Sequence, residues 1–184
     1  MGKLFVITGP SGAGKDSVIY KAKDLGLIFT QVITTSTREI RNGESEGHPY
    51  YFITVADFEK KIASQEMIEW AKVYGNYYGS SKIEVEHKLA ENNVVLVKVD
   101  PQGARTFKKM LPECKTIFIM PPSYDYLEKR LVNRETDSKE VIKQRLNTAK
   151  RELENLLDWD YLVVNEEGKL KDAALEVKEI IENK

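Results

Sequence analysis

The stretch "GPSGAGKDS" at residues 9–17 decides the fold class. Gly9, Gly14 and Lys15 match the pattern GxxxxGK, which here follows the apolar run "LFVIT" and precedes a segment of helical period. In that context the turn's backbone N–H groups, the helix N-terminus and the lysine all favour a phosphate ligand. A glycine-rich turn that binds nothing does not need this lysine at this spacing. The motif therefore predicts a loop that binds nucleotide phosphates.

The rest of the chain alternates short apolar runs with segments of helical period. The runs are "LFVIT" from Leu4, "VVLVKV" from Val94, "TIFIM" from Thr116 and "YLVV" from Tyr161. This alternation predicts an α/β fold in which helices flank a parallel sheet. Two helix starts are also predicted, because Thr54 with Asp57 and Ser81 with Glu84 have the spacing of capping boxes.

Composition sets further limits. The chain has 184 residues, 41% of them hydrophobic, which suits one folding unit. Its net charge of -1 predicts no affinity for nucleic acid or an anionic membrane. The single cysteine excludes an internal disulfide, and two isolated histidines do not suggest a metal site. Without a signal peptide or a long apolar run, a cytoplasmic protein is expected.

The loop departs from the usual pattern at Asp16. A serine or threonine usually stands there and binds magnesium through its hydroxyl. A carboxylate also binds magnesium, but phosphates repel it unless a cation intervenes. Lys98 stands where a kinase of this type normally has an acid at the end of a strand. We expect Asp16 and Lys98 to form an ion pair beneath the phosphates; the alternative is a solvated Asp16 with Lys98 pointing outward from a sheet edge.

Two segments interrupt the alternation. Residues 30–80 are rich in Thr, Tyr and Gly and contain "YYFIT" and "WAKVYGNYYGSS", which predicts a small, mostly β insertion. The segment "RLVNRETDSKEVIKQRL" has a polar centre between two helical patterns and is typical of a mobile helical flap.

Three separated motifs identify a resemblance. The string from Thr37 to Arg41, the Glu-Gly pair at residue 46 and "GNYYGS" from Gly75 resemble the guanylate kinase family, in order and spacing, over nearly the whole chain. The resemblance implies a P-loop nucleoside monophosphate kinase fold. It would comprise a core (1–31, 82–122 and 158–184), a β-rich GMP-binding subdomain (32–81) and a helical lid (123–157).

The resemblance also implies site residues. Those expected at the ATP phosphates are Gly9, Ser11, Gly12, Ala13, Gly14, Lys15, Asp16 and Ser17. Those expected at the GMP phosphate are Arg38, Arg41, Tyr50 and Tyr78, and those at the guanine edge are Thr34, Glu69, Ser80 and Asp100. Guanidinium and phenol groups suit a monophosphate, and a carboxylate accepts both hydrogens of the guanine edge. Taken singly, each of these side chains also has a structural alternative, such as a surface pair between Glu69 and Lys72.

The flap resembles the family's lid. Arg130, Arg134 and Arg145 occupy its arginine positions and would act with Lys15 on the transferred phosphoryl group. The middle arginine stands as "NRE", without the family's flanking glycines, and a surface pairing of Arg130 with Glu128 or Glu135 is the alternative. Asn165 matches a position near adenine, although an Asn after a strand is often a turn residue.

The expected cofactor is Mg²⁺ with ATP as co-substrate, and Asp16 is a candidate ligand for the metal, directly or through water. The expected partners are ATP and GMP, with dGMP as a further acceptor, and both monomer and dimer stay open. Two other functions also stay open. The "GKDS" spelling resembles the loop of ribose 1,5-bisphosphokinases, and a guanylate kinase-like binding module without catalysis is the third alternative.

Overall fold

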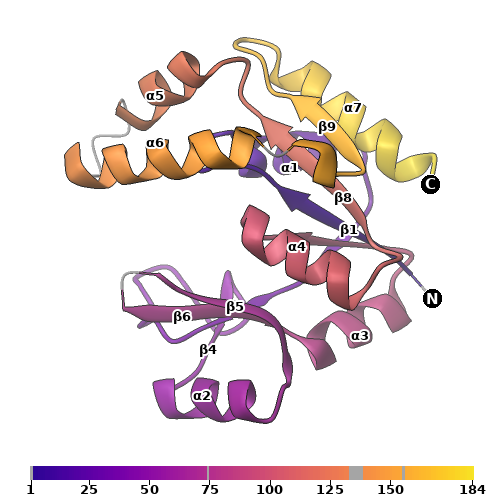
Figure 1. Ribbon diagram of the computed structural model, residues 1–184. Helices are drawn as coiled ribbons and strands as arrows, with labels where there is room; N and C mark the ends of the chain where they lie inside the picture. Colours follow the sequence, from indigo (N-terminus) through magenta and orange to yellow (C-terminus); the bar gives the residue numbers. More distant parts are fainter. Residues whose placement is uncertain (1, 74, 133–138, 155) are drawn as a thin grey trace.

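The computed structural model describes residues 2–73, 75–132, 139–154 and 156–184 (Figure 1). Its larger sheet has the strand order β2-β7-β1-β8-β9, and all four pairings are parallel. The strands are β1 (Lys3–Thr8), β2 (Thr30–Gln31), β7 (Val94–Lys98), β8 (Lys115–Met120) and β9 (Tyr161–Val164). The predicted α/β fold with a parallel sheet is confirmed.

Helices cover both faces of this sheet. They are α1 (Lys15–Asp24), α3 (Lys82–Glu91), α4 (Pro101–Met110) and α7 (Leu170–Glu182). Because side chains alternate along a strand, Phe5 and Ile7 of β1 enter the core beneath α1 and α7, whereas Leu4 and Val6 enter the core beneath α3 and α4. β1 is therefore buried on both faces, as expected for a central strand of a parallel sheet.

A second, four-stranded sheet has the order β4-β3-β6-β5. Its strands are β3 (Thr34–Ser36), β4 (Tyr50–Phe52), β5 (Met67–Val73) and β6 (Asn76–Ser81), and α2 (Val55–Ala63) packs beside it. Both predicted helix starts are confirmed, since Thr54 accepts from the Asp57 N–H and Ser81 from the Glu84 N–H. The assignment of residue ranges to a core, an acceptor subdomain and a lid stays a prediction.

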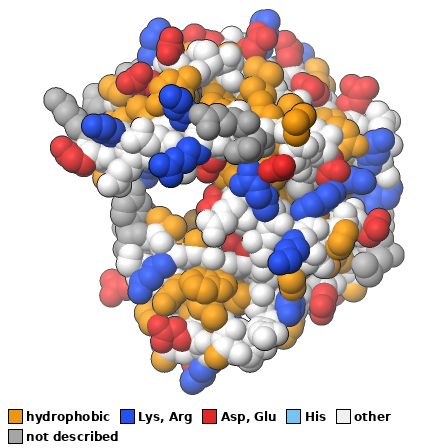
Figure 2. Space-filling view, viewed as in Figure 1, with side chains coloured by type: hydrophobic (Ala, Val, Ile, Leu, Met, Phe, Trp, Pro, Cys, Tyr) orange, Lys and Arg blue, Asp and Glu red, His pale blue; other side chains and the backbone are white. Residues whose placement is uncertain are grey.

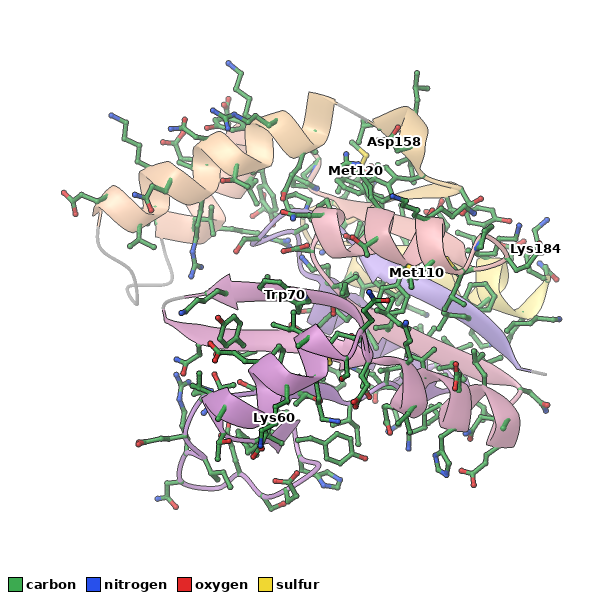
Figure 3. All side chains as sticks on the ribbon, turned by 60° about the horizontal axis from the view of Figure 1, so that its bottom comes forward. Lys60, Trp70, Met110, Met120, Asp158 and Lys184 are labelled. Carbon is green, nitrogen blue, oxygen red and sulfur yellow. The ribbon has the colours of Figure 1, made fainter. Side chains whose placement is uncertain are left out.

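Helices α5 (Tyr124–Val132) and α6 (Lys139–Glu154) extend from the core on the side of the second sheet, and η1 (Leu156–Asp158) follows (Figure 1). Figure 2 shows an opening between these helices and the second sheet, with Lys and Arg side chains on both of its sides. Trp70 on β5 packs edge to face against Tyr77, which stacks on Phe58 of α2. Lys184 lies at the side of the molecule opposite the start of α6 (Figure 3). Among the described residues, no helix has the length and apolar character to cross a membrane.

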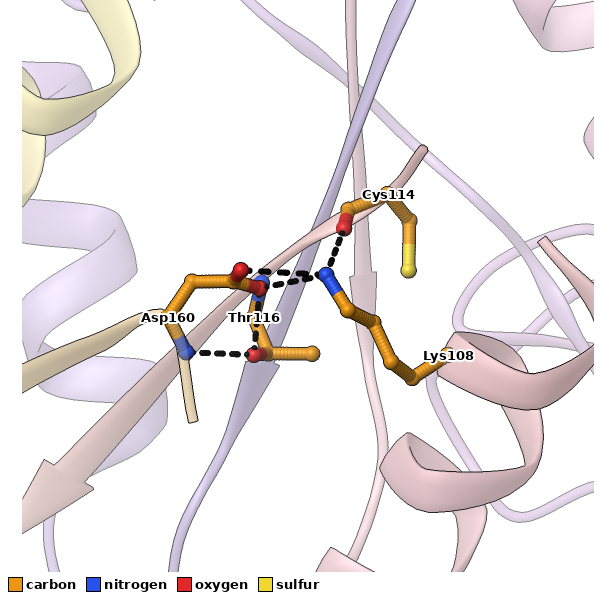
Figure 4. A network of polar contacts seen from close by, with 4 residues as sticks. All are labelled: Lys108, Cys114, Thr116 and Asp160. Atoms are coloured by element: carbon orange, nitrogen blue, oxygen red, sulfur yellow. Dashed lines mark hydrogen bonds and ion pairs between the residues drawn. The ribbon is translucent and has the colours of Figure 1, made fainter. Parts of the chain in front are cut away.

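A polar network joins α4 to the ends of two strands (Figure 4). The Lys108 Nζ donates to the Asp160 carboxylate at 2.8 Å and to the Cys114 carbonyl at 2.8 Å. Asp160 Oδ2 also accepts from the Thr116 N–H and Oγ1, both at 2.8 Å, and its own N–H donates to Thr116 Oγ1. These bonds hold α4 against the ends of β8 and β9, which helps to fix the position of α4 as a whole, including its first turn.

Candidate active site

The phosphate loop joins β1 to α1, as its sequence predicts. Gly9, Gly12 and Gly14 have φ values of 137°, 91° and 88°, in the region that side chains disfavour. A Cβ on Gly14 would lie 2.4 Å from Asn165 Nδ2, and a Cβ on Gly9 would lie 2.1 Å from the Ile119 carbonyl oxygen. Both backbone conformation and close packing therefore require glycine.

Lys15 begins α1 and turns back over the loop. Its Nζ donates to the carbonyl oxygens of Gly9 at 2.6 Å and Pro10 at 3.0 Å. Burial lowers the pKa of Lys15 to about 8, while the nearby Glu152 carboxylate on α6 opposes that shift. Burial in turn raises the pKa of Glu152 to about 7, and the Lys15 charge opposes it. A phosphate that replaces the two carbonyls would restore full charge to the lysine.

The predicted ion pair between Asp16 and Lys98 is confirmed, since Lys98 Nζ donates to Asp16 Oδ1. The alternative, an outward Lys98 on a sheet edge, is wrong because β7 lies between β2 and β1. The Lys98 and Asp16 side chains are 33% and 60% exposed, so the pair faces the opening and is accessible to solvent. The same prediction placed the pair beneath bound phosphates, and that part stays a prediction.

Two cavities meet beside this pair. A cavity of about 600 Å³ is lined on the loop side by Gly9, Ser11 and Lys15 and on the α6 side by Gln144, Arg145, Thr148 and Glu152. A cavity of about 240 Å³ is lined by residues of the second sheet, among them Thr34, Tyr50, Glu69 and Tyr78. Val73, Lys98, Val99 and Asp100 line both cavities. The end of β7 is therefore a wall that the two cavities share.

Glu69 is the acid of the smaller cavity. Its Oε1 accepts a hydrogen bond of 2.8 Å from the buried hydroxyl of Ser80, which excludes the surface pair with Lys72 as its main contact. Burial raises the pKa of Glu69 to about 7; the Ser80 bond opposes that shift, and the negative charge of Asp100 adds to it. Asp100 caps α4 by accepting from the Gly103 N–H at 2.7 Å. The predicted guanine-reading residues thus lie in one group.

Arg38 lies next to this cavity, held in a fixed orientation. Its guanidinium forms a two-point pair with Glu44, at 2.8 and 2.9 Å, and lies 5.5 Å from the ring centres of both Tyr50 and Phe52. The Tyr50 and Tyr78 rings meet edge to face at 5.7 Å. Three of the four predicted phosphate-binding residues are therefore neighbours. Arg41 is exposed and joins the group through its backbone N–H, which donates to Glu44.

Two residues far along the chain hold the loop from outside. Arg130 on α5 donates to the carbonyl oxygens of Gly12 and Ala13, at 3.4 and 3.2 Å, and its guanidinium also lies 4.7 Å from the ring centre of Tyr126 on its own helix. The buried Asn165 Nδ2 donates to the Ala13 carbonyl at 2.8 Å, so its role here exceeds that of a turn residue. Arg145 lines the larger cavity, whereas Arg134 lies outside the described residues.

Sequence reasoning missed two acids of the site. Glu44 is six residues after Arg38. It is an acid in the loop between the string from Thr37 to Arg41 and the Glu-Gly pair at residue 46, and that position was a signal for it. Glu152 lies on α6, and only the packing of α6 over the opening brings its charge to Lys15. No residue-spacing rule joins positions 15 and 152, so the sequence carried no signal for the second contact.

The donor set fits a magnesium ion bound mainly by substrate. Within the described ranges, no group of three or more Asp, Glu, His or Cys residues forms a metal cage. Magnesium in phosphate-transfer sites uses one or two carboxylates, substrate phosphates and water. Asp16 presents an exposed carboxylate at the loop, and the exposed Ser17 follows it. The residues present therefore fit the ion.

Comparisons with known proteins agree with this geometry. The family model described as "Guanylate kinase" matches residues 1–184. The guanylate kinase of Fusobacterium nucleatum subsp. nucleatum is 42% identical over 184 residues, covering 100% of this chain and 97% of that one. The guanylate kinase of Carboxydothermus hydrogenoformans is 44% identical over 166 residues, covering 90% and 81%. The crystal structure of guanylate kinase from Anaplasma phagocytophilum superposes with a TM-score of 0.73 at 28% identity, covering 99% and 85%.

Proposed function

The chain belongs to the guanylate kinase family and is a nucleoside monophosphate kinase, and we propose that it transfers the γ-phosphoryl group of ATP to GMP. The observation that carries this proposal is the shared wall at the end of β7, with a glycine-rich phosphate loop on one side and Glu69 on the other. Two anions bound in these cavities would face each other, as an in-line transfer requires.

The larger cavity is the proposed ATP phosphate site. Its loop offers backbone N–H groups at the N-terminus of α1, and Lys15 exchanges the Gly9 and Pro10 carbonyls for phosphate oxygens. Arg130 and Arg145 approach the same phosphates from α5 and α6. Mg²⁺, bound through Asp16 and the phosphates, would supply charge neutralisation there.

The smaller cavity is the proposed GMP site. Glu69, oriented by Ser80, accepts from the N1 and exocyclic amino hydrogens of guanine, a pair of donors that adenine lacks. Thr34 and Asp100 add polar groups to the same wall. Arg38, Arg41, Tyr50 and Tyr78 bind the phosphate, and the pair with Glu44 keeps the Arg38 fork in its orientation.

The chemistry needs no strong general base. A phosphate oxygen of GMP is already anionic at neutral pH; it forms the new bond to the γ-phosphorus, and the bond to the β,γ-bridging oxygen breaks with its electron pair staying on ADP. The protein positions the two anions and offsets their charge. The Glu69 and Ser80 pair disfavours a ribose bisphosphate acceptor, which lacks the adjacent N1 and amino donors of guanine.

A coupled assay of ADP release tests the proposal. The acceptors are GMP, dGMP, AMP, UMP and ribose 1,5-bisphosphate, each at several magnesium concentrations. We expect turnover with GMP, and more slowly with dGMP, that requires magnesium. Turnover with ribose 1,5-bisphosphate and none with GMP would favour the second alternative. GMP binding without turnover with any acceptor would identify a binding module.

A further inference from the structure

Lys98 occupies the position between the two substrate cavities. It is the last residue of β7, it pairs in register with Ile7 of β1, and its side chain lines both the 600 Å³ and the 240 Å³ cavity. Val99 and Asp100, which share the wall, are an apolar residue and an acid. Lys98 is therefore the cation among the four residues common to the two cavities.

A ligand can readily displace the ion pair between Lys98 and Asp16. Asp16 is 60% exposed and Lys98 is 33% exposed, and ion pairs between such groups contribute little to folding. A phosphate group carries more charge than one carboxylate and offers more acceptor oxygens. A phosphate that enters the shared wall thus competes well with Asp16 for the ammonium group.

The site also needs a cation at this place. Asp100 and Glu152 line the larger cavity, and both of them, like Asp16 at the loop, act on the pKa of Lys15 together with the Lys98 charge. Lys15 itself is committed to the loop side, where Gly9 and Pro10 hold it. Arg38 lies on the far side of the smaller cavity with Tyr50. Among the four residues that the two cavities share, Lys98 is the one that can give the donor-facing oxygens of an acceptor phosphate a positive partner.

We propose that Lys98 binds the acceptor phosphate directly, on the side that faces ATP, and is a catalytic residue that this chain has in place of the usual acid. This inference rests on the proposed function, because it needs a phosphate in each cavity. Lys98 transfers no proton in this role. Its charge lowers the repulsion between the attacking oxygen of the acceptor and the γ-phosphoryl group.

Equilibrium binding of GMP and of guanosine, without ATP, separates a phosphate contact from a purely structural role. The variants are Lys98→Met, Asp16→Asn and the double variant. Lys109→Met, which makes the same charge change at the exposed far end of α4, is the control. We expect Lys98→Met to weaken GMP binding at least fivefold, to leave guanosine binding within twofold, and to lower kcat. The control stays within twofold throughout.

The Asp16→Asn background distinguishes the two roles of Lys98. If Lys98 binds phosphate, Lys98→Met weakens GMP binding in the Asp16→Asn background as well, whereas Asp16→Asn alone does not weaken it. The inference is overturned if Lys98→Met no longer weakens GMP binding in the Asp16→Asn background, because Lys98 then only neutralises Asp16. An equal loss of guanosine binding also overturns it, since that indicates a damaged cavity.

Turnover of GMP by the protein without substitutions, called the parent here, distinguishes failure of this inference from failure of the proposed function. If the parent protein phosphorylates GMP while Lys98→Met binds GMP as the parent does, only the role of Lys98 is refuted. If the parent does not bind GMP, both proposals are refuted. If the parent binds GMP without turnover, the proposed function fails, and the guanosine comparison still decides whether Lys98 contacts the phosphate.

Discussion

Ser80 and Glu69 are register partners on the adjacent strands β6 and β5, and the Ser80 hydroxyl donates to the Glu69 carboxylate at 2.8 Å. The bond uses Oε1. The other oxygen, Oε2, lies 3.2 Å from the Cβ position of Gly103, so a side chain on Gly103 would crowd it. The Glu69 carboxylate is thus oriented by the Ser80 hydroxyl at one oxygen and by close packing against α4 at the other.

Glu69→Gln is expected to reduce acceptor selectivity. The amide keeps the shape but loses the negative charge and one acceptor, so GMP affinity should fall about 30-fold, equivalent to roughly 2 kcal/mol. Isothermal titration with GMP and AMP measures the change. Ser80→Ala is the milder companion, because it removes the orienting bond and leaves the carboxylate. Unchanged GMP affinity in Glu69→Gln would place guanine elsewhere.

The same carboxylate predicts a pH dependence. With the pKa of Glu69 raised to about 7, the charged form that accepts from guanine becomes populated as pH rises from 6 to 8. Affinity for GMP should rise over this range more steeply in the parent than in Glu69→Gln, which retains only the titration of GMP itself. The ligand-free protein should show the opposite trend in stability. A raised carboxyl pKa contributes stability below about 4.5, and that contribution is lost as pH rises through 7.

ATP affinity should decrease above pH 8. The pKa of Lys15 is lowered to about 8, so the ligand-free enzyme loses the charge that binds phosphate as pH rises from 7.5 to 9.5. The fall is at most about tenfold per pH unit, because one proton is involved. Lys15→Arg stays charged at every pH tested, so its affinity, although weaker, should be flat. A parallel decline in both proteins would assign the effect to another group.

Asn165 and Gly14 are expected to be coupled. Asn165→Ala removes the bond to the Ala13 carbonyl and should raise the KM for ATP about fivefold, equivalent to roughly 1 kcal/mol, with GMP binding unchanged. Gly14→Ala should be more damaging, since its Cβ would meet Asn165 Nδ2 at 2.4 Å and its φ is 88°. The double variant relieves the clash and should show a smaller loss than the sum of the two. Strict additivity would refute the contact.

The network of Figure 4 predicts a stability effect away from the site. Asp160→Ala leaves the Thr116 N–H without its acceptor and the Lys108 ammonium with the Cys114 carbonyl alone, and should lower the free energy of unfolding by roughly 1–3 kcal/mol. Asp158→Ala is the matched control, because its pair with Arg105 is exposed and is worth about 0–1 kcal/mol. Thermal unfolding of both variants checks the order, and equal losses would show that the network adds no stability.

The parts of the site that the sequence predicted are those fixed locally or by strand ends. The loop from Gly9 to Lys15 needs only a strand, three glycines and a helix start, all of which are visible in residues 4–17. The Asp16 and Lys98 pair also followed from the sequence, because neighbouring parallel strands bring their carboxyl ends to one edge of the sheet. The prediction came from the exchanged charges, an acid in the loop and a base where a strand usually ends in an acid, and it left the solvated alternative open.

The parts that the sequence did not predict depend on packing across the opening. Glu152 acts on Lys15 only because of how α6 crosses the core, and no periodicity encodes that crossing. The position of Asn165 near adenine stays a prediction, and the bond from its nitrogen to the loop backbone was not foreseen. The phosphate contact expected of Arg38 stays a prediction, but its partner Glu44, which orients the guanidinium in the structure, was not foreseen. Side-chain partners of this kind follow from three-dimensional geometry.

The pairing of β1 with β7 has a consequence for the distance between donor and acceptor. The phosphate loop continues β1, the shared wall continues β7, and the Val99 N–H donates to the Ile7 carbonyl at 3.2 Å, so the pairing persists to the rim of the cavities. Neighbouring strands lie about 4.8 Å apart. The phosphate loop and the shared wall are therefore held at a separation set by backbone pairing, and a single inhibitor that spans both cavities would need a linker matched to that separation.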